Sequence, residues 1–263
     1  MTASTPSPRQ ATPSPVLDVR RVEHAILLMH FDDVWVTRIL DGGALGLSPD
    51  ERALFDGVDR RGFHADGERA ARAAGVVIEE LPVAVAVAGV PRLLSFFRDD
   101  AFARVIVHGT PLVVAAAAWL DNVPARIEGA VARARRRKRL PTGDVVVAAH
   151  VASAVAPEDA VERWARARAD LGTDVVAAVA GGRRVPWAAA AEHGDAGVLV
   201  NGDPASPAVA RCALPLARLI ARLGEGVDVP AFRAIARDEG CDDDVEADAL
   251  LADLVADGLL VRR

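Results

Sequence analysis

The chain has 263 residues and a formal net charge of −6, and it is 51% hydrophobic with 4% aromatic residues and no tyrosine. This length suffices for two domains with separate, mainly aliphatic cores. The negative charge gives no overall attraction to nucleic acid or to an anionic membrane. Two cysteines, Cys212 and Cys241, are too few for a disulfide framework, which favours a reducing, cytoplasmic setting.

The first fifteen residues are rich in Ser, Thr and Pro and lack the apolar run of a secretory signal. We expect residues 1–15 to be a disordered tail. The most apolar segment, 111–120, has about half the length of a membrane-spanning helix. The sequence therefore predicts no membrane segment.

Residues 16–140 predict an all-helical domain. Apolar residues recur at helical spacing between Val16 and Leu40. Ser48-Pro49-Asp50-Glu51 is a capping box that predicts a short helix through Phe55. Further helices are expected at 66–80, from Pro91 onward, and at 101–107, 111–120 and 123–139.

The pattern changes after Pro141-Thr142-Gly143, which we take as the domain boundary. Residues 145–147 and 150–155 are β-branched and strand-like, and a helix follows from 157 to 171. The turn sequence Asn201-Gly202-Asp203-Pro204 lies between two apolar runs, 196–200 and 209–214, and predicts a hairpin. Residues 141–263 are thus expected to form an α+β domain.

The last fifty residues predict three short helices and one strand. Pro215 opens the first helix, Asp228 can cap the second, and the third begins after three aspartates at 242–244. Gly258 ends the third helix before a short strand. This order is typical of a winged helix. The predicted fold class is therefore α+β, with a helical domain followed by a winged-helix-like C-terminal domain.

The charge on the third of these helices argues against DNA reading. Seven acidic residues occupy it, with no Lys or Arg between them: Asp242, Asp243, Asp244, Glu246, Asp248, Asp253 and Asp257. A DNA-reading helix presents Arg, Lys, Asn or Gln instead. A winged helix can alternatively accept a peptide as an added strand.

The basic run Arg133–Arg139 leaves a DNA-binding alternative open. Its five arginines and one lysine could bind phosphate or an acidic partner. They could equally be a solvated helix end, where cations are favourable. A winged-helix transcription regulator that uses this run is therefore the alternative hypothesis, although nucleic acid is the less favoured ligand.

No catalytic pattern is present in the sequence. The six histidines are scattered, and no H-E-x-x-H, G-x-S-x-G, P-loop or dinucleotide-binding motif occurs. His30 with Asp32 and Asp33 is the nearest approach to a metal cluster, and a solvated helix face explains it more simply. The aspartates beside Cys241 raise a thiol pKa, which makes it a poor nucleophile. We therefore predict no catalytic residue, no metal ligand and no cofactor.

Several segments together resemble one protein family. They are Phe31–Val36, Leu81-Pro82, Leu94–Phe102, Ala118-Trp119-Leu120 with the basic helix end, Val145–Val155, the loop Gly181–Arg184 and the closing winged helix. Over residues 20–263 the chain resembles the accessory proteins encoded beside multinuclear non-heme iron oxidative enzymes in ribosomal natural-product pathways. The methanobactin accessory subunit and its thiaglutamate-pathway counterpart are examples.

This resemblance implies a non-catalytic partner that forms a heterodimer with the iron oxidase and holds the leader of a precursor peptide, partly by strand pairing. Candidate peptide-binding residues are Val145, Val147, Val151, Leu199, Leu250 and Leu254. Candidate residues facing the enzyme are Arg98, Phe102, Arg135 and Arg137. Aliphatic residues at the six peptide-binding positions are more typical of a hydrophobic core than of a binding site. The sparse aromatic content leaves open which side chains form a leader groove.

Overall fold

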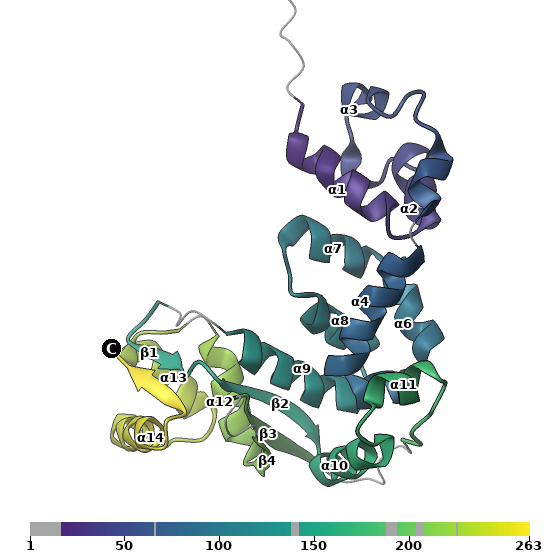
Figure 1. The fold of residues 1–263 in the computed structure, drawn as a ribbon. Coiled ribbons are helices and arrows are strands. Elements are labelled where there is room, and N and C mark those ends of the chain that lie inside the picture. The colour runs from purple at the N-terminus through teal and green to yellow at the C-terminus, as the bar shows by residue number, and fades with distance from the viewer. Residues whose placement is uncertain (1–16, 66, 138–141, 188–193, 204–207, 225) are drawn as a thin grey trace, which may run out of the picture. The chain divides into compact units, whose positions relative to one another are not determined.

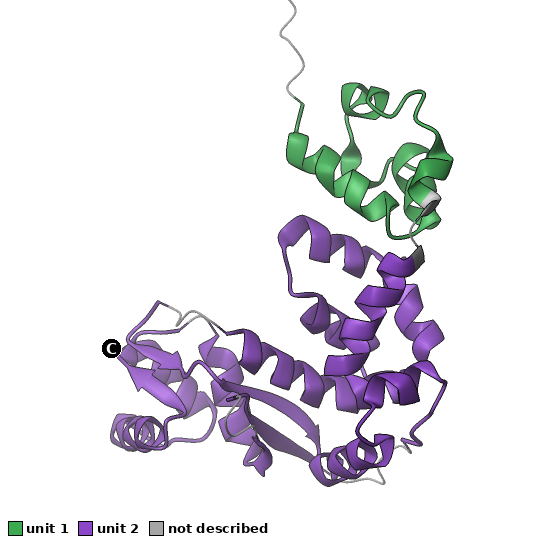
Figure 2. Ribbon diagram, in the orientation of Figure 1, with its two compact units in different colours: residues 1–67 green, residues 68–263 purple. Residues whose placement is uncertain are grey.

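The computed structural model describes residues 17–65, 67–137, 142–187, 194–203, 208–224 and 226–263. The chain divides into two compact units, residues 1–67 and 68–263 (Figure 2). The expected tail at 1–15 and the expected boundary at 140–141 lie outside the described residues. The fold is mixed α+β, mainly helical with small antiparallel sheets, and this level of the predicted fold class is confirmed.

Unit 1 consists of short helices, three of which begin at a side-chain cap. Its elements are α1 (Val19–Met29), α2 (Asp33–Leu40), η1 (Ala44–Gly46), α3 (Pro49–Ala53) and η2 (Arg60–Ala65). The helical pattern predicted up to Leu40 is interrupted at Asp32, whose carboxylate accepts from the Val34 N–H and starts α2. The capping box is confirmed: Glu51 accepts from the Ser48 N–H at 2.8 Å, and Ser48 accepts from the Glu51 N–H at 3.2 Å.

Unit 2 begins with a run of helices (Figure 1). They are α4 (Gly67–Glu80), α5 (Pro82–Ala88), α6 (Val90–Phe96), α7 (Asp100–His108), α8 (Leu112–Leu120) and α9 (Val123–Arg136). Helix α5 was not expected from the sequence. Gly89, with φ of +92°, separates it from α6, and this backbone conformation is open to glycine and strained for other residues.

The strands form two antiparallel sheets. β1 (Val145–Val147) pairs with β5 (Leu260–Arg262), so segments more than a hundred positions apart lie side by side. β2 (Val151–Pro157), β3 (Asp195–Asn201) and β4 (Ala208–Cys212) form a second sheet in the order β2-β3-β4. The hairpin β3–β4 was predicted, and part of its turn lies outside the described residues. Helices α10 (Ala160–Leu171) and α11 (Val175–Ala180) connect β2 to β3.

The three-stranded sheet lies between α9 and α12 (Leu214–Leu223). Side chains on alternate positions of β2 and β3, such as Ala152 and Val200, share a core with α9. On the other face, the Ser153 hydroxyl donates to the Ala217 carbonyl of α12 at 2.7 Å. A Cβ on Gly197 would lie 2.6 Å from the Ala213 carbonyl oxygen and 2.8 Å from the Ala217 Cβ. Only glycine lets α12 pack this closely on the sheet.

The C-terminal module consists of α12, α13 (Val229–Asp238), α14 (Asp244–Ala256) and the β1–β5 pair. Its mainly aliphatic core combines residues from all five elements, including Val145, Leu223, Phe232, Leu251 and Leu260. The predicted three helices and final strand are confirmed. The predicted cap at the start of α13 is also present, since the Asp228 side chain accepts from the Ala231 N–H at 2.8 Å.

Candidate functional site

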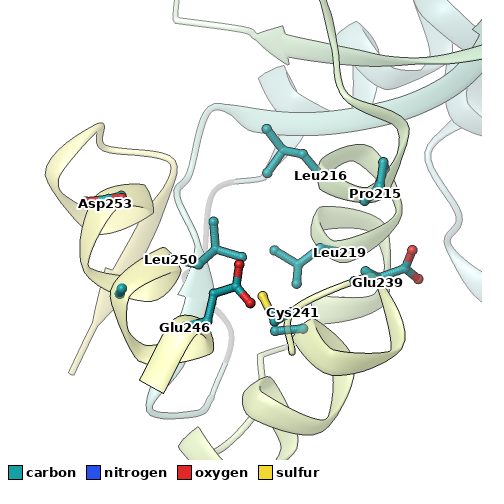
Figure 3. Close-up of a pocket in the computed structure, with 11 residues that line it drawn as sticks. Pro215, Leu216, Leu219, Glu239, Cys241, Glu246, Leu250 and Asp253 are labelled. Atoms are coloured by element: carbon teal, nitrogen blue, oxygen red, sulfur yellow. The ribbon is translucent and has the colours of Figure 1, made fainter. Parts of the chain in front are cut away.

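An open groove of about 390 Å³ lies in the C-terminal module between α12 and α14, with the end of α13 at its base. We call it the α12–α14 groove. It is lined by Pro215, Leu216, Leu219, Ala236, Glu239, Gly240, Cys241, Glu246, Ala249, Leu250 and Asp253. Figure 3 shows leucines of α12 on one side of the groove and Leu250 of α14 on the other. Its volume is near the lower end of the ~300–1,000 Å³ typical of ligand pockets.

The way in which α12 and α14 pack on the module core explains why these leucines line the groove. Leu219 and Leu223 of α12 and Leu251 and Leu254 of α14 are buried in the module core. Leu216 and Leu250 stand at the edges of the same apolar faces and are only half-buried. The groove is therefore the part of the apolar surface that the core does not cover.

Three arginines brace the helices that form the groove. Arg222 of α12 donates to Asp238 at 2.8 Å and to Glu239 at 3.2 Å, which ties α12 to the end of α13. Arg233 of α13 binds Asp248 of α14 through two hydrogen bonds of 2.8 and 2.6 Å. This pairing holds the pKa of the Asp248 carboxyl below its ordinary value.

A third link pairs the first turn of α14 with α13. Arg237 lies 3.6 Å from Asp244. The arginines of α13 thus neutralise part of the acidic surface of α14. Together these pairs tie both helices that form the sides of the groove to α13.

Two acidic residues of the groove remain outside this bracing. Among the described residues, no ion pair involves Glu246 or Asp253. Glu246 accepts from the backbone N–H of Asp242 at 2.6 Å. Glu246, Leu250 and Asp253 occupy positions i, i+4 and i+7 of α14, respectively. This spacing places the three side chains along one face of the helix. The groove therefore combines apolar leucines on both sides with negative charge along its α14 wall.

Cys241 also faces the groove, and its sulfur points toward the space between Leu219 and Glu246 in Figure 3. Burial raises the pKa of this thiol, and the nearby charges of Glu246, Asp242 and Asp243 raise it further. The thiol is therefore protonated at neutral pH, which makes Cys241 a poor nucleophile.

All six candidate peptide-binding residues come together in the core of the C-terminal module. Val145, Val147, Val151 and Leu254 are buried there, whereas Leu199 and Leu250 are half-buried at its margin. The four buried side chains stabilise the module and offer almost no surface to a ligand. Of the six, Leu250 lines the α12–α14 groove.

The candidate enzyme-facing residues do not form one surface. Phe102 is 1% exposed and packs edge-on against Phe96 and Phe97 at centroid distances of 5.7 and 5.2 Å. This aromatic core leaves its ring no surface for a partner. Arg98 is exposed on the turn before α7.

The arginines of the basic run make internal contacts. Arg133 and Arg137 donate to the Ser153 and Val151 carbonyls of β2, at 3.2 and 3.3 Å. Arg135 and Arg136 both approach Glu80 of α4, with Arg136 at 2.8 Å. Lys138 and Arg139 lie outside the described residues. The described part of the run thus fastens α9 to β2 and α4.

Sequence reasoning missed a buried carboxylate, Glu128 of α9, which is 1% exposed. Its oxygens accept from the backbone N–H groups of Val83 and Ala84 at 3.2 and 2.9 Å and from the Trp164 indole N–H at 3.1 Å. Arg168 of α10 lies 3.9 Å away. Burial raises the pKa of Glu128 to about 7, against the opposing effect of these donors and of Arg168.

Glu128 therefore joins α5, α9 and α10 at one point. It also lines a second pocket of about 330 Å³, together with Glu79, Arg135 and Arg168. Because each oxygen of Glu128 already has a protein donor, we interpret this residue as structural.

The described residues contain no group of three or more His, Cys, Asp or Glu side chains that could hold a metal ion. Within the same part of the chain, no helix combines the length and apolar character needed to cross a bilayer. A scan of known family models, a search of curated proteins and a search of solved structures each found no significant match to this chain.

Proposed function

We propose that this chain is a non-catalytic subunit that binds a precursor peptide and presents it to a multinuclear non-heme iron oxidase. The observation that carries the proposal is the α12–α14 groove, an open apolar surface with one acidic wall. Such a groove is better suited to binding a peptide side chain than to catalysing a reaction, because its thiol is protonated and its carboxylates lie beside leucines. The resemblance of the sequence to accessory subunits supplies the identity of the partner. In this proposal the partner holds the iron, and the chain works in the cytoplasm.

The proposal also treats the C-terminal module as winged-helix-like. Two observations support this interpretation. The module has three consecutive helices, and β1, which precedes them in the chain, pairs antiparallel with β5, which follows them. The groove between α12 and α14 would then be the face that the module uses for ligands.

The alternative, a DNA-binding regulator, has less support. The acidic face of α14 would repel phosphates, and the arginines at 133, 135, 136 and 137 are engaged with β2 and Glu80. Titration of a fluorescent random duplex at several salt concentrations tests this alternative. Salt-dependent binding at micromolar protein would favour it over peptide binding.

Co-expression tests the main proposal. The chain would be produced with a candidate oxidase and precursor peptide taken from the neighbouring genes, and the products separated by size-exclusion chromatography. We expect a complex that contains the chain and the oxidase and retains the peptide. A chain that elutes alone in the presence of both would contradict the proposal.

A further inference from the structure

The wall of the α12–α14 groove carries a defined spacing of charge. Glu246 and Asp253 are seven positions apart on α14, and Leu250 lies between them. At the helical rise of about 1.5 Å per residue, the two carboxylates are separated by roughly 10 Å along the helix axis. A ligand that satisfies both must therefore carry two cations about as far apart, with an apolar group between them.

The third carboxylate of the groove contributes less to this pattern. Glu239 is held at 3.2 Å by Arg222 and is 12% exposed at its side chain. Its charge is already compensated. The field available to a ligand comes mainly from Glu246 and Asp253, which have no ion pair within the described residues and line the groove on α14, across from Leu216 and Leu219 of α12.

We infer that the α12–α14 groove selects a peptide segment in which an apolar side chain lies between two Lys or Arg residues about 10 Å apart. The apolar side chain enters between Leu216 and Leu250, and the two cations pair with Glu246 and Asp253. This inference rests on the proposed function, since it names the class of peptide that the groove takes. In an extended segment alternate side chains share a face, so the two residues are four positions apart (about 13 Å of backbone, which the long side chains can shorten) with the apolar residue midway. In a helical segment they are about seven positions apart.

Synthetic peptides test the inference on the full chain. One fluorescent probe carries two lysines four positions apart with a leucine midway between them, so that all three side chains share a face when the segment is extended. A second probe carries the lysines seven positions apart in an alanine-rich helix, with a leucine between them on the same face. Their twins have glutamate in place of each lysine. We expect one of the lysine probes to bind in a fluorescence anisotropy titration, more weakly as salt rises, and neither twin to bind. Failure of both lysine probes, or equal binding of a twin, would overturn the inference.

Neutral variants locate the charge effect. The double variant Glu246→Gln, Asp253→Asn should weaken binding of the lysine probe by about fivefold to tenfold, because two charge pairs are lost. Asp257→Asn removes an acidic group from the end of the same helix, outside the groove, and should leave affinity unchanged. Circular dichroism checks that each variant folds. If the double variant and the unmodified chain bound the lysine probe with equal affinity, the proposed pairing with Glu246 and Asp253 would be wrong.

The two cysteines provide an internal control for the place of binding. Cys241 lines the groove, whereas Cys212 lies in β4, and both are half-buried free thiols. The bound probe should slow iodoacetamide labelling of Cys241, measured by mass spectrometry, and leave Cys212 unaffected. Protection of both thiols, or of neither, would place the peptide elsewhere.

The outcomes separate this inference from the proposed function. A chain that forms the complex with oxidase and precursor but binds neither lysine probe keeps the proposed function and loses the inference. A chain that binds a lysine probe in the groove but elutes without the oxidase keeps the inference and loses the proposed function.

Discussion

Unit 2 holds carboxylates in two contrasting settings, one around Glu128 and one along the α12–α14 groove. Glu128 is buried, and its oxygens accept from three N–H groups of α5 and α10. Glu246 and Asp253 are exposed, and they line an open groove together with the half-buried side chains of Leu216 and Leu250. The first arrangement already gives each carboxylate oxygen a protein donor, whereas the second offers a ligand both apolar surface and charge that no ion pair among the described residues compensates. Burial of a satisfied polar group indicates a role in folding, and charge beside open apolar surface indicates binding.

Removing the buried carboxylate should give the largest effect on stability. Glu128→Ala leaves the N–H groups of Val83 and Ala84 and the Trp164 indole without their acceptor. We expect the free energy of unfolding to fall by about 4 kcal/mol, as measured by urea denaturation. Glu79→Ala, an exposed neighbour in the same pocket, is the matched control and should change it by less than about 0.5 kcal/mol. Equal effects of the two substitutions would show that Glu128 does not hold the helices together.

Two adjacent leucines of α14 sharpen the contrast between core and groove. Leu251 is 2% exposed in the module core, whereas Leu250 lines the groove. Leu251→Ala should destabilise the chain by about 3 kcal/mol, and Leu250→Ala by less than about 1 kcal/mol. The affinity for the lysine probe, measured by fluorescence anisotropy, should show the reverse order: Leu250→Ala should lose affinity and Leu251→Ala should keep it. Similar stability losses in both variants would assign Leu250 to the core.

The pH dependence of stability should identify Glu128. Its pKa is raised to about 7 in the folded chain from an ordinary value of 4.5, so the folded state binds the proton more tightly than the unfolded state. The resulting stabilisation is full below pH 4.5 and is lost as pH rises through 7, a change of roughly 3 kcal/mol. We would measure the unfolding free energy of the unmodified chain and of Glu128→Gln from pH 4 to 8. The difference between the two separates the contribution of Glu128 from that of other titrating groups. A difference that stays constant with pH would contradict this assignment.

The contact between the sheet and α12 should give a smaller effect. Gly197→Ala places a methyl group against the Ala213 carbonyl and Ala217, so α12 must shift on the sheet. We expect a loss of about 2 kcal/mol in thermal or urea unfolding. Gly194→Ala adds a methyl group where no atom lies within 4 Å and serves as the control. A neutral Gly197→Ala would mean that α12 moves freely relative to the sheet.

Local signals in the sequence predicted much of the secondary structure. The capping box at Ser48 and the cap at Asp228 each depend on residues three positions apart, which a single sequence displays directly. Helix α5 escaped prediction because its end depends on the positive φ of Gly89, and short apolar runs do not reveal that conformation. The pairing of β1 with β5 joins distant segments, so periodicity alone could not establish it.

The candidate site was less predictable because exposure depends on tertiary packing. Leu250 and Leu254 have the same helical periodicity, yet one lines the groove and the other is core. Phe102 was expected at an interface and is covered by Phe96 and Phe97. The sequence does contain one indication that Glu128 is buried. It lies on the same face of α9 as the apolar residues Pro124, Ile127 and Val131. A carboxylate on the apolar face of a helix indicates a buried polar partner.

Hydrogen–deuterium exchange of the full chain, with and without the candidate precursor peptide, tests the central claim most directly. Peptide binding in the α12–α14 groove predicts slower exchange in segments 215–223 and 244–256, with segments 82–88 and 123–136 around Glu128 unchanged. Slower exchange confined to the edge strand β4 or to α9, or no change anywhere, would contradict the claim that this groove receives the peptide.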